Sequence, residues 1–178
     1  YLFLNEDLCE TLSLSHDLGH TPFGHAGEDV LNECMSSYGG FDHNIQTLRI
    51  ITLLENKYYQ FKGLNLTIET LDGLIKHNGP IHNSSKYKKN LKSNFFLDKI
   101  IFKDSASLEA QVAAISDDIA YNNHDLEDGL RAGLFDITKL KSIKLISKII
   151  LKHNNTKNFR REIIVNQIVR ELINKMVL

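Results

Sequence analysis

Apolar residues recur at intervals of three or four positions along most of the chain, which is the period of an amphipathic α-helix. Near the start, Leu8 and Leu12 lie on one such stripe, and Asn5 precedes them as the expected N-cap. We therefore expect a first helix that ends at about residues 16–17. Two glycines and a proline in the stretch LGHTPFG then interrupt the pattern.

The same period predicts further helices over 25–35, 43–56, 67–77, 95–103, 107–132, 136–153 and 158–176. Residues 95–103 are also compatible with a strand, but no neighbouring segment offers a pairing partner, so a helix is favoured. The polar stretch 78–93 contains Gly-Pro and Asn-Ser-Ser and is expected to be a long loop. Together these segments predict an all-α fold in a single domain.

Composition narrows the choice of protein class without selecting one. The chain has 178 residues, 42% apolar and 24% charged, which is ordinary for a globular protein, and a net charge of -1 excludes a global basic field for nucleic acid. Two cysteines outside any CxxC motif indicate a reduced, cytoplasmic compartment. No apolar run reaches about 18 residues, so no membrane span is expected. Because the first residue is Tyr1 and helical patterns run to both ends, we expect truncation at both ends.

Titratable residues crowd into the stretch SHDLGHTPFGHAGE, which covers residues 15–28. The adjacent His16 and Asp17 offer one imidazole nitrogen and one carboxylate oxygen, a donor set that suits a borderline divalent cation. The alternative is a polar helix end, with Asp17 exposed and His16 half-buried. The dipeptide alone does not decide between these readings.

The metal-ligand interpretation is favoured by four segments that occur in this order: SHDLGHTPFGHAGE, GGFDHNIQTLRI, GLNLTIETLDGLIKHNGP and EAQVAAISDDIAYNNHDLEDGLRAG. With them the sequence resembles HD-domain phosphohydrolases, and among these the deoxyguanosine triphosphate triphosphohydrolase (dGTPase)-like group. The resemblance implies an HD-domain helical bundle, with core motifs in 1–133 and extra helices in 134–178. It also implies hydrolysis of a deoxynucleoside triphosphate to deoxynucleoside and inorganic triphosphate, with a divalent ion (Mg, Mn, Fe, Ni or Zn) as cofactor.

Site residues follow from the matching positions. The resemblance implies the metal ligands His16, Asp17 and Asp117, and a further histidine ligand upstream of this chain's first residue. On a helix, Asp117, Tyr121 and Asp125 share one face, whereas Asp118 points about 100° away. The resemblance therefore implies Asp117 as the ligand rather than its neighbour.

The resemblance also assigns catalytic and substrate roles. It implies acid–base work for His25 and Glu28, which lie three residues apart on one helical face, with His20 beside them. The alternative for His25 and Glu28 is a helix N-terminus with a stabilising acidic residue in its first turn. The alternative for His20 is a loop histidine that makes a structural hydrogen bond. The implied substrate contacts are His43, Tyr121, Asp125 and His77. A histidine such as His77 is also common at helix C-termini without any function, because the helix dipole favours a positively charged side chain there.

Three readings of function remain open from the sequence. The first is the dGTPase-like enzyme, acting on a deoxynucleoside triphosphate as a homo-oligomer, with single-stranded nucleic acid or a nucleotide effector as further candidate partners. The second is another HD-type nucleotidase or phosphodiesterase. The third is a catalytically impaired fragment that serves as a nucleotide-binding or oligomerisation module. The lysine-rich run 86–92 is expected to be a solvated loop rather than an anion site.

Overall fold

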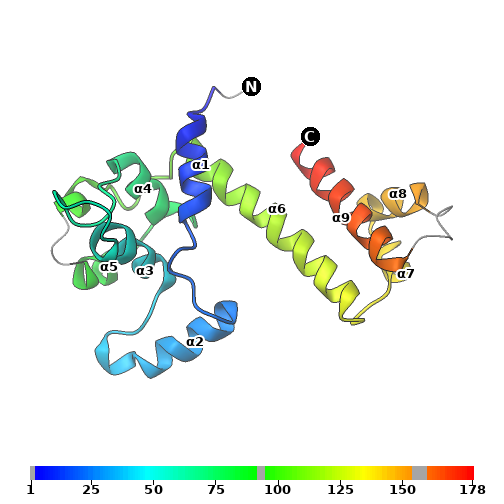
Figure 1. Cartoon of the computed structure of the whole chain (residues 1–178), viewed down its shortest axis with the longest axis horizontal. Coiled ribbons are helices and arrows are strands. Elements are labelled where there is room, and N and C mark those ends of the chain that lie inside the picture. Colours follow the sequence, from blue (N-terminus) through cyan, green and yellow to red (C-terminus); the bar gives the residue numbers. More distant parts are fainter. Residues whose placement is uncertain (1–2, 92–94, 154–159) are drawn as a thin grey trace. The chain divides into compact units, whose positions relative to one another are not determined.

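The computed structural model describes residues 3–91, 95–153 and 160–178, and the regular structure in these ranges is helical (Figure 1). The predicted all-α fold is confirmed. The helices are α1 (Glu6–Ser15), α2 (Gly24–Cys34), α3 (His43–Arg49), α4 (Ile68–Lys76), α5 (Ser85–Asn90), α6 (Leu108–Arg131), α7 (Ile137–Leu140), α8 (Lys144–Lys152) and α9 (Arg161–Val177). Shorter turns are η1 (Ser36–Tyr38), η2 (Ile50–Leu54) and η3 (Phe95–Lys99). Within the described ranges, no helix combines the length and apolar character that crossing a bilayer demands.

Side-chain caps explain where three helices of the N-terminal half begin. Asn5 accepts a hydrogen bond from the Leu8 N–H at 3.1 Å, as its position in the sequence predicts. Asp42 caps α3 at 3.1 Å, and Thr67 caps α4 at 3.4 Å. Each cap satisfies a backbone donor that the first helical turn leaves without an intrahelical partner.

Some predicted boundaries are wrong. The stretch expected to be a loop over 78–93 contains α5, whose Tyr87 is buried, although residues 92–93 fall outside the described ranges. The helix expected over 136–153 is two helices, α7 and α8, separated by residues 141–143. The helix expected over 95–103 is only the five-residue 3₁₀ turn η3.

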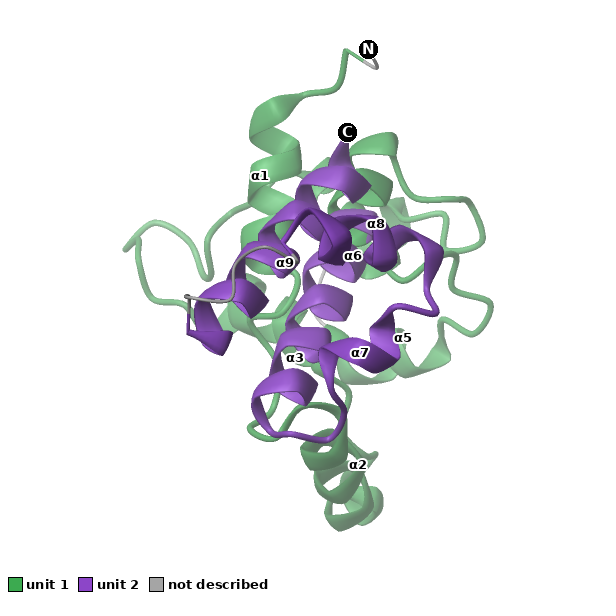
Figure 2. Ribbon diagram, turned by 90° about the vertical axis from the view of Figure 1, so that its right-hand side faces the viewer, with its two compact units in different colours: residues 1–114 green, residues 115–178 purple. Residues whose placement is uncertain are grey.

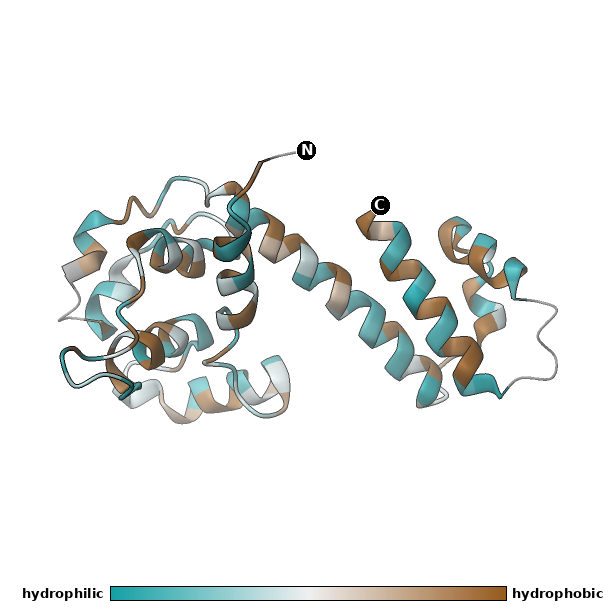
Figure 3. Cartoon of the chain, turned by 45° about the horizontal axis from the view of Figure 1, so that its top comes forward, coloured by the Kyte–Doolittle hydropathy of each residue, from teal (hydrophilic) through white to brown (hydrophobic). Residues whose placement is uncertain are grey.

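The chain divides into two compact units, Tyr1–Ala114 and Ile115–Leu178, coloured green and purple in Figure 2. The boundary falls within α6. The expectation of one HD domain with its core motifs in 1–133 stays a prediction. In both units the helices carry apolar and polar residues in alternation along their length (Figure 3), as the sequence period requires.

Each unit has its own apolar core. The fully buried side chains of the first core include Leu12, Leu48, Ile51, Ile75 and Leu91. The second core is built from α6 to α9, and its most buried members are Leu130, Val165, Ile168 and Leu172. In the first unit, α1 and α3 both pack against α4, whereas α2 buries none of its residues and projects from the other helices (Figure 1).

Candidate metal and catalytic site

The loop after α1 lies directly on α3, and Gly19 makes this approach feasible. The Gly19 N–H donates to Thr47 Oγ1 at 2.9 Å, and the Thr47 hydroxyl donates to the His16 carbonyl at 3.0 Å. A Cβ at Gly19 would overlap the backbone of α3 at His43 and Thr47. This packing brings the loop histidines beside the N-terminus of α3.

We expect Gly19→Ala to destabilise the fold by about 3 kcal/mol, because the added methyl meets backbone that cannot rotate away. Urea unfolding measures the change. The matched control is Gly24→Ala at the first residue of α2, where the new Cβ has open space around it. Gly24 has φ +58°, so its substitution costs only about 1 kcal/mol of left-handed backbone strain. Equal losses in the two variants would contradict the close approach.

His16 and Asp17 lie at the C-terminal end of α1. The His16 Nδ1 donates to the Ser13 carbonyl at 3.0 Å, and its Nε2 lies 3.5 Å from Asp17 Oδ2. The side chain of His16 is 15% exposed and that of Asp17 is 51% exposed. This burial agrees with the polar helix end and is equally compatible with a ligand pair open to a cation, so the ligand role stays a prediction.

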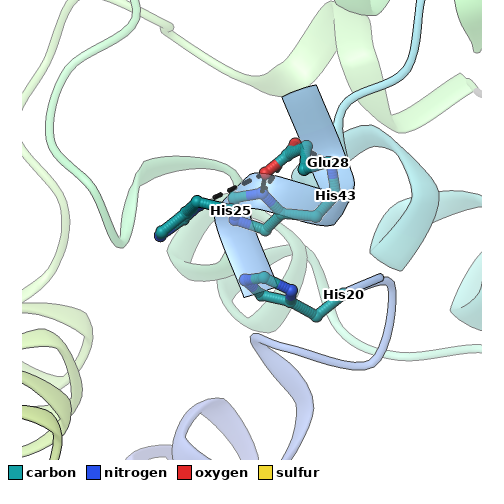
Figure 4. Close-up of side chains that lie close together, drawn as sticks. All are labelled: His20, His25, Glu28 and His43. Carbon is teal, nitrogen blue, oxygen red and sulfur yellow. Dashed lines mark hydrogen bonds and ion pairs between the residues drawn. The ribbon is translucent and has the colours of Figure 1, made fainter. Parts of the chain in front are cut away.

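A second group of donors forms where the loop, α2 and α3 meet. Figure 4 shows Glu28 joined by dashed lines to His25 and His43, with the His20 ring beside them. Glu28 Oε2 lies 2.8 Å from His43 Nδ1 and 3.4 Å from His25 Nδ1. The rings of His20 and His43 stack with centroids 4.9 Å apart. One donor atom from each of the four residues lies within 4.8 Å of the others.

The closer partner of Glu28 is therefore His43, which sequence reasoning did not pair with it. Glu28 Oε1 also accepts the backbone N–H of His43 at 2.8 Å. His43 is the first residue of α3, so this N–H has no partner inside the helix. From the sequence, Asp42 could have been recognised as the N-cap of α3, which places the His43 N–H in the first helical turn. No local pattern indicates that a carboxylate fifteen residues earlier accepts from this N–H.

Two side chains in this region, Glu28 and His77, have shifted pKa values. Burial raises the pKa of Glu28, but hydrogen bonds from the backbone and ring of His43 and from His25 outweigh it, so the pKa is lowered overall. The Glu28 side chain is thus a carboxylate at neutral pH. Burial is also the main reason why the pKa of His77 is lowered, and a neutral imidazole results.

His77 and Asp17 are brought together with His43. One donor atom from each of these three residues lies within 4.8 Å of the other two. His43 consequently belongs both to this group and to the group around Glu28. The rings of His77 and His16 also meet edge to face, with centroids 5.4 Å apart.

Asp117, Tyr121 and Asp125 lie in the second unit, spaced by single turns of α6. All three are exposed, and Tyr121 is 57% exposed. The buried Asn123 marks a different side of the helix, where its amide contacts Met176 Sδ at 3.4 Å. The shared face is consistent with the spacing, and the meeting of Asp117 with the His16–Asp17 pair stays a prediction.

One residue of the lysine-rich run 86–92, Lys86, has a structural contact. Lys86 Nζ lies 3.0 Å from Asp42 Oδ2, so α5 is tied to the cap of α3 rather than fully solvated. Lys92 lies outside the described residues. His124, which repeats the His-Asp dipeptide with Asp125, has a side chain 68% exposed and lies 3.8 Å from Glu127.

The donor chemistry near Asp17 fits a divalent ion. Imidazole nitrogens with one carboxylate are typical ligands of Zn²⁺, Fe²⁺, Ni²⁺ and Mn²⁺, whereas Ca²⁺ takes oxygen ligands. His16 and His77 each donate Nδ1–H to a backbone carbonyl, the outer contact that metal-bound histidines commonly have.

Comparison with known proteins shows what this all-α chain, with its clustered histidines and carboxylates, is similar to. The chain is 59% identical over 178 residues to a deoxyguanosinetriphosphate triphosphohydrolase-like protein of Pelagibacter ubique (strain HTCC1062), covering 99% of this chain and 48% of that relative. Proteins of the same name from Parvibaculum lavamentivorans and Bradyrhizobium sp. (strain ORS 278) are each 50% identical, with 98% and 99% of this chain and 45% of each relative covered.

The resemblance to the dGTPase-like group is thus confirmed over nearly the whole chain. The chain spans about half the length of the curated relatives it matches. No protein-family model matches it.

Proposed function

We propose that the chain is part of a metal-dependent hydrolase that converts a deoxynucleoside triphosphate, with dGTP as the first candidate, to the deoxynucleoside and inorganic triphosphate. The names of the relatives support the substrate class. The observation that carries the proposal is the position of His43, which belongs both to the group with Asp17 and to the group with Glu28. The candidate metal ligands and the candidate acid–base residues therefore lie next to each other.

In this proposal the cation is held by His16, Asp17 and Asp117. When bound, a divalent ion supplies Lewis-acid polarisation of a phosphate oxygen and lowers the pKa of water towards about 7. The protein's own contribution is to fix the donors. The contacts of Thr47 with the loop and of His16 with the Ser13 carbonyl keep the His16–Asp17 pair in place.

Hydrolysis at the α-phosphorus needs a group that takes a proton from water and a group that gives one to the departing 5′-oxygen. His25 is suited to this because its side chain is 69% exposed while its Nδ1 faces Glu28. Glu28 holds the Nδ1–H of His43, which leaves Nε2 of that ring as an acceptor. His20, stacked on His43, would lie against the phosphates.

The sugar would be held from α6. Tyr121 would pack against the deoxyribose and its ring would exclude a 2′-hydroxyl, and Asp125 would accept a hydrogen bond from the 3′-hydroxyl. The exposure of both side chains is consistent with this role.

Product analysis tests the function. The purified chain is expected to release inorganic triphosphate from dGTP with Mn²⁺ or Mg²⁺, and to lose this activity in chelator. Orthophosphate or pyrophosphate as the first product would instead indicate another nucleotidase or phosphodiesterase. Binding of dGTP without any product would favour the nucleotide-binding module, and triphosphate release in chelator would refute the metal requirement.

Asp117→Ala is expected to lower the metal bound per chain, whereas Asp118→Ala leaves it unchanged. The reason is helical geometry, since the two neighbouring carboxylates point about 100° apart. Both residues are exposed on α6, so each variant should fold and the two form a matched pair. Equal losses of metal, measured by elemental analysis after dialysis, would contradict the choice of Asp117 over its neighbour.

A further inference from the structure

Two neighbouring helices of the first unit end in the same way. Helices α1 and α4 pack against each other, and their C-caps are His16 and His77. In each case the ring Nδ1 donates to the carbonyl three residues earlier: to Ser13 at 3.0 Å and to Leu74 at 2.8 Å. The hydrogen is thereby placed on Nδ1, and Nε2 of each ring carries the lone pair.

The carboxylate of Asp17 lies close to both rings. His16 Nε2 lies 3.5 Å from Asp17 Oδ2, and donor atoms of Asp17, His43 and His77 lie mutually within 4.8 Å. The two rings themselves meet edge to face, with centroids 5.4 Å apart. Within the first unit, the imidazoles of His16 and His77 thus each lie close to the Asp17 carboxylate.

The electrostatics of this position favour a cation over a phosphate. The C-terminal end of an α-helix carries a partial negative charge, and here two such ends and a carboxylate meet. A phosphate beside His77 would be repelled by Asp17 and by both helix ends. A divalent ion gains from all three.

We propose that Nε2 of His77 is a ligand of the divalent ion, together with His16 and Asp17, and is not a substrate contact as the sequence alone implied. The proposal rests on the proposed function, because it concerns the same ion. It adds a second imidazole to the donor set from a helix that the His-Asp motif does not include. The α1–α4 packing holds this imidazole in place before the ion arrives.

Histidine ring spectra of the full chain test the assignment directly. In protein labelled with ¹⁵N-histidine, the first equivalent of Zn²⁺ is expected to shift the Nε2 signals of His16 and His77. Signals are assigned with His16→Gln and His77→Gln. The exposed His82 should not respond, and His82→Gln is the control variant.

Calorimetric titration gives the second readout. His77→Gln is expected to weaken Zn²⁺ binding at least about tenfold, the loss that even an outer contact of a metal site commonly causes, while His82→Gln binds like the wild type. An unmoved His77 signal, with unchanged affinity in His77→Gln but weakened binding in His16→Gln, would overturn this proposal and leave the proposed function standing. Absence of any binding to the wild type would overturn both. If His77→Gln fails to fold, through-bond correlations from the backbone to the ring assign the His77 signal in the wild-type protein, whose response to Zn²⁺ then decides the matter.

Discussion

Replacing Asp17 by asparagine is expected to abolish divalent-ion binding and to reduce triphosphate release by roughly a thousandfold or more, since metal polarisation of a phosphate is worth several kcal/mol of barrier. Asparagine keeps the shape of the side chain and removes its charge. In the group of donors that Asp17 forms with His43 and His77, the Asp17 side chain is the one carboxylate, so this substitution removes the group's negative charge. Mn²⁺ titration and product analysis of the same preparation measure the two losses.

The matched control for this experiment is Asp29→Asn. Asp29 is an exposed carboxylate on α2, so the substitution makes the same chemical change away from the helix ends. We expect wild-type metal affinity and activity from it. Retained Mn²⁺ binding in Asp17→Asn would contradict the ligand role, and comparable losses in both variants would attribute the effect to net charge.

The second large effect is expected from Glu28→Gln, which should lower turnover by about 10² to 10⁴, the range that general acid–base catalysis supplies. The carboxylate contacts both His43 and His25, and a neutral amide cannot stabilise charge on either ring. Metal affinity should stay near the wild-type value. Because the pKa of Glu28 is lowered, the advantage of the wild type should persist as pH falls through about 4.3, the ordinary value for glutamate.

Glu33→Gln, at an exposed position of the same helix, is the control and should be active. Two results would exclude acid–base work by Glu28. One is unchanged turnover in Glu28→Gln. The other is a fall in metal affinity that matches the fall in rate, which would make Glu28 a ligand instead.

Local features of the sequence predicted most helices well. Capping side chains and apolar stripes act within a few residues, so the sequence alone identifies Asn5 as an N-cap. Helix α5 was missed because its six residues are polar apart from Tyr87, and that ring is buried by contacts with distant segments such as Phe102. The break between α7 and α8 has no glycine or proline to signal it.

The candidate site shows the same difference between local patterns, which the sequence reveals, and long-range packing, which it does not. Motif spacing identified the His16–Asp17 pair and the i, i+3 relation of His25 and Glu28. The stronger contact of Glu28 with His43 spans fifteen residues and depends on how α2 and α3 meet, which no local pattern encodes. The proximity of His77 to Asp17 likewise depends on the packing of α1 against α4.

The most direct test of the central claim is anomalous diffraction from crystals of the full chain grown with Zn²⁺, measured on both sides of the zinc absorption edge. We expect a peak with donor atoms of His16, Asp17 and Asp117 about 2.0–2.2 Å away, and with His77 Nε2 at the same distance if the further inference holds. Side chains of His16, Asp17 and Asp117 that point to separate places, with no peak among them, would contradict the proposed hydrolase.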